Sequence, residues 1–99
     1  MTTMLMGLRP THPGEILRED VIPALGRSKT AIAAALGVSR HTLYKVLDER
    51  SPVTPQLAVR LGKLCGNGPE IWGRMQLAFD LAAAATVVDV ESIPTLGAA

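Results

Sequence analysis

Two short amphipathic segments separated by a glycine dominate the pattern of apolar and polar positions along the chain. In both segments the apolar residues recur at the spacing of one helical face. These residues are Ile32, Ala33, Leu36, Leu43, Val46 and Leu47. Gly37 suits the left-handed conformation that ends a helix, and Ser28 and Ser39 suit the N-caps of the two segments. The pattern therefore predicts two helices joined by a sharp turn, the second over residues 39–48.

Proline and glycine mark the ends of three further helical patterns. The first begins at Pro13, after a cap at Thr11 or His12, and ends at Pro23 with Gly26. The second follows the cap Thr54 and ends before residue 66, and the third begins at residue 69. Residues 86–90 are β-branched and alternating, which is consistent with a strand or with a frayed helix end.

These elements predict an all-α fold, a five-helix domain of the lambda-repressor type with a short extended C-terminal tail. We expect a flexible N-terminal arm over residues 1–11, the helix-turn-helix domain over residues 12–85 and the tail over residues 86–99. At 99 residues the chain fits one domain, of a size at which a partner often covers part of the apolar surface.

The second of the two short helices has a polar face of the kind that reads base edges in a DNA major groove. The candidate base readers are Arg40, His41, Thr42, Tyr44 and Lys45. Ser28, Lys29 and Ser39 lie at helix N-termini, where phosphates bind, and Arg50 follows the recognition helix as a further phosphate contact. The alternative is an ordinary pair of helices with a solvated polar face.

Charge is distributed unevenly, although the net charge is only +1. Seven Lys and Arg against two acidic residues give +5 over residues 27–63, whereas residues 1–26 carry −1 and residues 64–99 carry −3. A basic middle that coincides with the motif is the electrostatic footprint of a phosphate-facing surface. The fourth-helix cations Arg60 and Lys63 fit either a DNA contact or plain solubilising charge.

No arrangement of residues with the spacing of a catalytic or metal site is found, so we expect neither an enzyme nor a cofactor. The soft metal ligands are His12, His41 and Cys65, and no two of them share a helical spacing. A single cysteine, here expected to be a buried thiol, fits a reducing compartment. With no apolar run long enough for a membrane span and no signal peptide, we expect a cytoplasmic protein with no membrane contact.

Three motifs resemble the HigA antitoxins, which combine an Xre/Cro-type helix-turn-helix with a role in type II toxin-antitoxin modules. They are His12-Pro13-Gly14-Glu15-Ile16-Leu17, Leu36-Gly37-Val38-Ser39-Arg40, and Pro69-Glu70-Ile71-Trp72 followed by Met75-Gln76 and Phe79-Asp80-Leu81. The resemblance covers roughly residues 10–96, including Ile93-Pro94 in the tail.

The resemblance implies a homodimer that binds operator DNA, represses its own operon and neutralises HigB, a small RelE-like toxin that cleaves mRNA. Some positions depart from the family pattern. Asp48-Glu49-Arg50-Ser51 stands where Asn-Gly and a basic pair are common, which puts acids near the DNA backbone and a non-glycine residue at a positive φ. Gly68 replaces the usual capping Ser or Thr before the last helix.

Two other functions fit the same residues. One is a stand-alone transcriptional repressor without a toxin, and the other is a protein-interaction module whose DNA face has decayed. Separately, the last helix carries more apolar surface on one side than a short helix needs, so part of that surface is expected at a dimer contact. The residues concerned are Ile71, Trp72, Met75 and Phe79.

Overall fold

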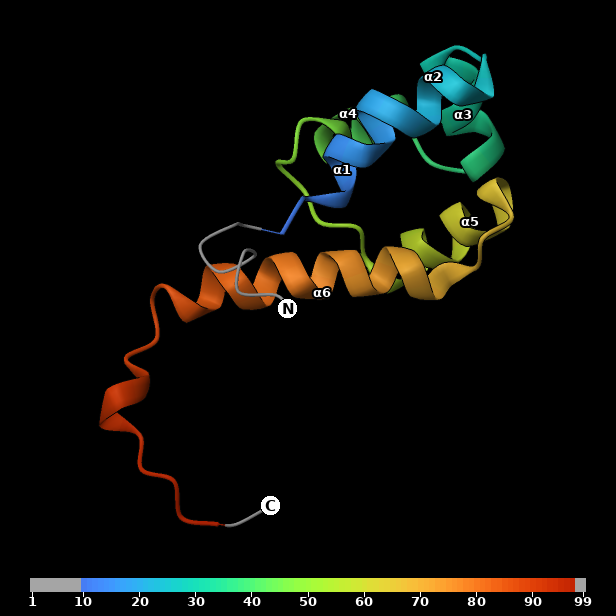
Figure 1. Ribbon diagram of the computed structural model, residues 1–99. Coiled ribbons are helices and arrows are strands. Elements are labelled where there is room, and N and C mark those ends of the chain that lie inside the picture. The colour runs from blue at the N-terminus through green and yellow to red at the C-terminus, as the bar shows by residue number, and fades with distance from the viewer. Residues whose placement is uncertain (1–9, 98–99) are drawn as a thin grey trace.

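The computed structural model describes residues 10–97. Most of the predicted N-terminal arm, residues 1–9, lies outside the described part of the chain, as do residues 98–99. The elements in order are α1 (Pro13–Ile16), η2 (Leu17–Val21), α2 (Ile22–Leu25), α3 (Lys29–Leu36), α4 (Arg40–Leu47), α5 (Pro55–Cys65), α6 (Pro69–Ala85) and η3 (Val90–Ser92) (Figure 1). The prediction of an all-α fold with five helices is confirmed. The segments α1, η2 and α2 follow one another without a break and together form the first of the five helices.

The first helix depends on a histidine cap and contains a π-helical turn. His12 is buried, and its Nδ1 accepts a hydrogen bond of 2.9 Å from the backbone N–H of Gly14. The helix runs through Pro23 and ends at Gly26, whose φ of +65° is left-handed. Proline removes one backbone donor, and the wider π-helical turn η2 lies directly before it, where such irregularities are usual.

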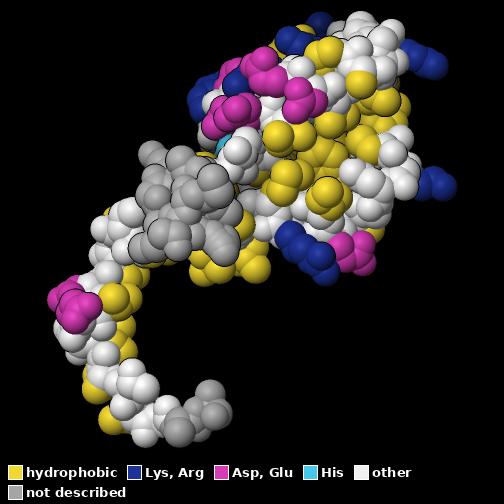
Figure 2. Space-filling model, in the orientation of Figure 1, with side chains coloured by type: hydrophobic (Ala, Val, Ile, Leu, Met, Phe, Trp, Pro, Cys, Tyr) yellow, Lys and Arg dark blue, Asp and Glu magenta, His cyan; other side chains and the backbone are white. Residues whose placement is uncertain are grey.

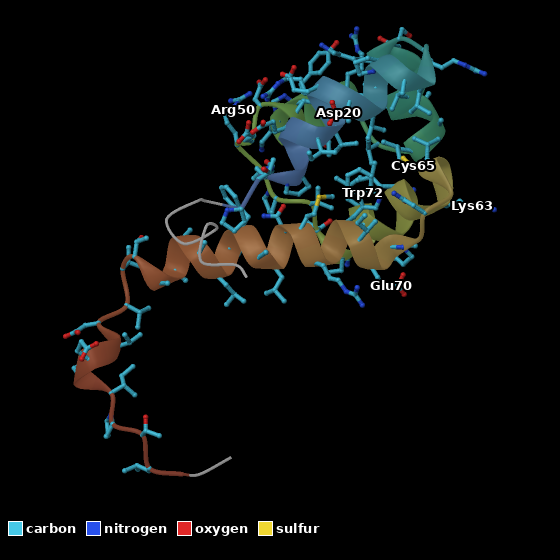
Figure 3. The ribbon with its side chains drawn as sticks, in the orientation of Figure 1. Asp20, Arg50, Lys63, Cys65, Glu70 and Trp72 are labelled. Carbon is cyan, nitrogen blue, oxygen red and sulfur yellow. The ribbon has the colours of Figure 1, made fainter. Side chains whose placement is uncertain are left out.

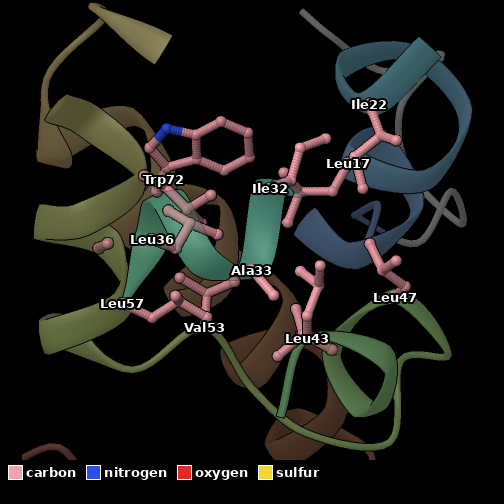
Figure 4. Close-up of a cluster of buried hydrophobic side chains, with 13 residues drawn as sticks. Leu17, Ile22, Ile32, Ala33, Leu36, Leu43, Leu47, Val53, Leu57 and Trp72 are labelled. Carbon is pink, nitrogen blue, oxygen red and sulfur yellow. The ribbon is translucent and has the colours of Figure 1, made fainter. Parts of the chain in front are cut away.

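The core lies where α1, η2, α2, α3 and α4 pack against α5 and α6 (Figure 4). Leu17 of η2, Leu43 and Val46 of α4, and Leu61 of α5 are almost completely buried. The buried faces of α3, α4 and α5 are the apolar faces that the helical spacing predicted. Cys65 is only half-buried, and burial raises the pKa of its thiol.

Trp72 corrects the predicted dimer stripe. Its side chain is only 1% exposed, points from α6 into the bundle (Figure 3), and donates its indole N–H to Asn67 Oδ1 at 3.1 Å. A side chain enclosed by its own chain has no surface left for a partner, so the assignment of Trp72 to a dimer contact is wrong. Met75 and Phe79 are half-buried, and Phe79 lies edge-on to the His12 ring at 4.8 Å. Only Ile71 of the predicted stripe is exposed.

The tail forms turns in place of a strand. Residues 86–89 leave α6 through a turn, the 3-10 segment η3 follows, and no strand occurs within residues 10–97. The large apolar side chains of the tail are exposed, and Figure 1 shows the tail projecting away from the helices. The same residues contain no helix long and apolar enough to span a bilayer and no cluster of three metal-ligating side chains.

A buried glutamine joins α6 to the loop before α5. Gln76 Oε1 accepts a hydrogen bond of 2.7 Å from the backbone N–H of Val53, and Gln76 Nε2 donates to Asp80 Oδ1 at 2.9 Å. Both Gln76 and Val53 are buried. The glutamine thus satisfies a backbone donor that water does not reach.

Replacing this glutamine should destabilise the fold. In Gln76→Met the N–H of Val53 loses its partner, and an unsatisfied buried donor costs about 1–3 kcal/mol. Gln56→Met is the matched control, because Gln56 is exposed on α5 and such surface changes usually stay within about 0.5 kcal/mol. Urea denaturation followed by circular dichroism measures both variants. Equal stabilities of the two would contradict a structural role for the Val53 hydrogen bond.

Candidate nucleic-acid interface

The turn between α3 and α4 has the local geometry that a helix-turn-helix needs. Ser28 Oγ accepts from the N–H of Ala31 at 3.0 Å, and Ser39 Oγ accepts from the N–H of Thr42 at 3.0 Å. Gly37 has a left-handed φ of +76°, and Val38 packs inward against the core. The predicted caps Ser28 and Ser39 and the predicted turn at Gly37 are confirmed.

Helix α4 separates its residues cleanly between core and solvent. Leu43, Val46 and Leu47 are buried, so the opposite side of the helix faces outward. That outward side holds all five predicted base readers: Arg40, His41, Thr42 and Tyr44 are exposed and Lys45 is half-buried. All five can donate or accept hydrogen bonds, and Arg40 and Lys45 add positive charge.

Lys29 and Tyr44 connect the start of α3 to this face. The Lys29 ammonium lies 5.7 Å from the centre of the Tyr44 ring, within the range of a cation–π contact. The contact holds a cation beside the exposed N-terminus of α3, where backbone N–H groups are also available to an anion. Ser39 Oγ and Thr42 Oγ1 are 2.9 Å apart, which orders the first turn of α4 in the same way.

The segment after α4 is strained and acidic. Glu49 has a φ of +63° and is the only non-glycine residue with positive φ among residues 10–97, as its place in the sequence predicted. Arg50 Nη2 lies 3.3 Å from Asp48 Oδ2, so the predicted phosphate contact at Arg50 is already paired with a carboxylate. The neighbouring acid therefore competes with DNA for this cation.

Arg18 holds the end of the recognition helix, a role that the sequence did not reveal. Its Nη1 donates to the Leu47 carbonyl at 2.6 Å and to Glu49 Oε2 at 3.2 Å, and its Nε donates to Glu19 Oε2 at 2.8 Å. The hydrogen bond with Glu19 is the largest cause that raises the pKa of the guanidinium above its ordinary value; burial opposes it, and the hydrogen bond with Glu49 adds a smaller increase. Nothing in the spacing of residue 18 distinguishes it from a solvated cation, since its two partners at the end of α4, Leu47 and Glu49, are 29 and 31 residues away.

Arg60 likewise has a structural task. Its Nη1 donates to the Leu36 carbonyl at 2.9 Å and so satisfies the C-terminal end of α3 beside Gly37. Lys63 lies at the other end of the domain from Arg50 (Figure 3), away from the exposed side of α4. Of the two doubtful fourth-helix cations, Arg60 is a helix-terminus contact and Lys63 stands apart from the recognition face.

Comparison with known proteins places this geometry in a family. No model of a known protein family matches the chain. Antitoxin HigA-1 of Vibrio cholerae is 34% identical over 73 residues, 74% of this chain and 69% of its own. The chain spans about two thirds of the length of the first curated relatives that it matches, 65% and 72%.

Two solved structures extend the likeness over the whole fold. The antitoxin GraA, solved in complex with its operator, is 40% identical with a TM-score of 0.83, over 92% of this chain and 95% of that one. Pseudomonas aeruginosa antitoxin HigA, solved with the higBA promoter, is 33% identical with a TM-score of 0.79, over 89% of this chain and all of that one. The chain belongs to the HigA antitoxin family.

In this HigA-family protein the backbone is strained at Glu49, directly after the recognition helix. A left-handed conformation costs a non-glycine residue about 1–2 kcal/mol, and Glu49 adopts it while pairing with Arg18. At Glu49 the ion pair with Arg18 therefore stabilises the fold, while the left-handed backbone conformation destabilises it.

Two substitutions separate these opposing effects. Glu49→Gln removes the charge and keeps the strained backbone, whereas Glu49→Gly removes both charge and strain. We expect the glycine variant to be more stable than the glutamine variant by about 1 kcal/mol. Thermal unfolding at equal protein concentration measures the difference. A glutamine variant at least as stable as the glycine variant would mean that the turn accommodates a side chain without strain.

Proposed function

We propose that this HigA-family protein is a DNA-binding antitoxin that represses its own operon as a dimer and neutralises a HigB-like, mRNA-cleaving toxin by direct contact. The observation that carries the proposal is the exposed polar side of α4, held by a helix-turn-helix of standard form. The operator and promoter complexes of GraA and Pseudomonas aeruginosa HigA support it, because this chain matches both over most of its length.

In the proposed complex α4 enters the major groove, with Arg40 and Lys45 at base edges and with Tyr44 beside sugar or methyl groups. Lys29 and the capped N-termini of α3 and α4 hold phosphates on either side of the groove. A dimer places two such helices about 34–36 Å apart on one side of the duplex, so the operator should be a pseudo-palindrome.

The acidic ends of the chain supply the proposed contact with a basic toxin. The first helix carries Glu15, Glu19 and Asp20, and the residues from α6 onward carry four acids against Arg74 alone. Figure 2 shows acidic side chains gathered on one part of the domain and again on the tail. Opposite charge speeds the encounter of two proteins and favours the correct partner.

Base reading and phosphate binding should respond differently to sequence and to salt. Arg40→Ala should cost about 1–3 kcal/mol on the operator and much less on scrambled DNA, because a base contact exists only at the right base. Lys29→Ala should weaken both duplexes, and the slope of log affinity against log salt should become shallower by about 1.

Titrations of both variants on operator and scrambled duplexes at several salt concentrations test this assignment. Lys63→Ala is the matched control, since Lys63 lies away from α4 and should change neither affinity nor slope (Figure 3). If Arg40→Ala and Lys29→Ala lost affinity equally on both duplexes, α4 would not be the sequence reader.

The toxin contact is tested by co-expression. The product of the neighbouring gene, expressed with a tagged copy of this protein, should co-elute with it and lose its toxicity to the host cell. A neighbour that neither binds nor loses toxicity, together with normal operator binding, would leave a stand-alone repressor as the function. Toxin binding without operator binding would favour an interaction module with a decayed DNA face.

A further inference from the structure

The contact between Lys29 and Tyr44 differs from those of the arginines at the end of the recognition helix. The Lys29 ammonium lies 5.7 Å from the centre of the Tyr44 ring, and Lys29 forms no ion pair within residues 10–97. Arg18 and Arg50, by contrast, are paired with carboxylates. The face of an aromatic ring attracts a cation although the ring has no net charge. Tyr44 therefore orients Lys29 and leaves its positive charge unneutralised.

The two partners come from different helices of the motif, and both are open to solvent. Lys29 is the first residue of α3 and is exposed, and Tyr44 is 40% exposed on the outward side of α4. A long lysine side chain loses much rotamer freedom when it is fixed against a ligand. The ring restricts that freedom before a ligand arrives, so the entropic cost of the contact with the ligand becomes smaller.

The ring holds Lys29 at a point that suits an oxyanion. The first backbone N–H groups of a helix have no acceptor within the helix. At the start of α3, Ser28 Oγ accepts only from the N–H of Ala31, and the N–H groups of Lys29 and Thr30 have no hydrogen-bond partner within residues 10–97. An ammonium beside free N–H groups is an arrangement that binds phosphate.

We infer that Tyr44 is a positioning residue for phosphate binding: its ring holds Lys29 at the start of α3, so that the two side chains act as one unit on the DNA backbone. The inference rests on the proposed function in taking α4 and the start of α3 to lie on DNA. It gives Tyr44 a role that does not depend on the base sequence, beside its place near sugar or methyl groups.

Arg50 shows why a neutral partner matters. DNA must take the Arg50 guanidinium from Asp48, and breaking that ion pair leaves a carboxylate near the phosphates. A phosphate that binds Lys29 meets no such competitor, because the ring can keep its contact with the side chain while the ammonium binds the anion. Positioning by a ring therefore favours DNA binding, whereas positioning by an acid opposes it.

The first test measures binding of the full chain to a scrambled duplex, on which base reading has no part. Tyr44→Leu should weaken this binding by about 2- to 5-fold, the strength of an exposed cation–π contact. Tyr44→Phe is the matched control, because it removes the hydroxyl and keeps the ring, and its affinity should equal that of the unmodified chain. Circular dichroism verifies the fold of both variants, which an exposed position should preserve.

The second test is a double-mutant cycle on the same scrambled duplex. In a Lys29→Ala background, Tyr44→Leu should cause no further loss, because the cation that the ring positions is gone. Lys45→Ala supplies the matched background, since Lys45 is a cation on the same side of α4 without a cation–π contact within residues 10–97. There Tyr44→Leu should still cause its full loss of about 2- to 5-fold.

The third test needs no DNA. In the free protein the ring current of Tyr44 should shift the NMR signals of the Lys29 methylene protons next to the ammonium upfield. Tyr44→Leu should abolish this shift and Tyr44→Phe should preserve it. The corresponding protons of Lys63, on α5, should keep their positions in both variants.

Four results would overturn the inference. They are a Tyr44→Leu loss confined to the operator, a loss that persists in full in the Lys29→Ala background, a Tyr44→Phe loss as large as that of Tyr44→Leu, and a free protein without the Lys29 ring-current shift. If one of them appeared while the unmodified chain bound its operator, the positioning role would fail and the proposed function would stand. An unmodified chain that bound neither duplex would contradict the proposed function, and the positioning role with it.

Discussion

The close approach of the first helix to the recognition helix is the constraint on which the rest of the structure depends. A Cβ at Gly14 would overlap the carbonyl oxygen of Val46, so only glycine allows the two backbones to lie this close. The approach lets Leu43 and Val46 become almost fully buried. Once that face is fixed in the core, the polar residues of α4 have no direction except outward. The outward direction of the polar residues of α4 therefore depends on a glycine, Gly14, in the first helix.

The sequence predicted the elements well because their ends depend on local chemistry. Serine, threonine and histidine caps at positions 28, 39, 54 and 12 satisfy backbone donors two or three residues away, and left-handed glycines at positions 26, 37 and 66 end three of the five helices. Such contacts join residues that are close together in the sequence, so the local sequence pattern predicts them. The positive φ at Glu49 was predictable for the same reason, since the turn after α4 requires it whatever residue stands there.

Long-range contacts could not be predicted in this way. Helical spacing identifies Trp72 as apolar and inward on α6, but it does not say whether the inside belongs to the same chain or to a partner. Likewise Arg18 and Arg60 look like surface charges in the sequence, yet both bind carbonyl groups at the ends of other helices. The basic footprint of residues 27–63 is thus smaller than its seven cations imply, because Arg60 serves the fold and Arg50 is paired with an acid.

The completeness of the core within one chain has a consequence for how the protein responds to its own abundance. Because Trp72 closes the bundle from inside, the single chain buries its apolar core without help from a second copy, unlike obligate dimers that have no folded monomer. Folding and pairing are then separate equilibria. A folded monomer that binds DNA as a pair gives operator occupancy that rises with the square of the protein concentration when the protein is scarce, so that synthesis of the protein shuts itself off over a narrow range of concentration.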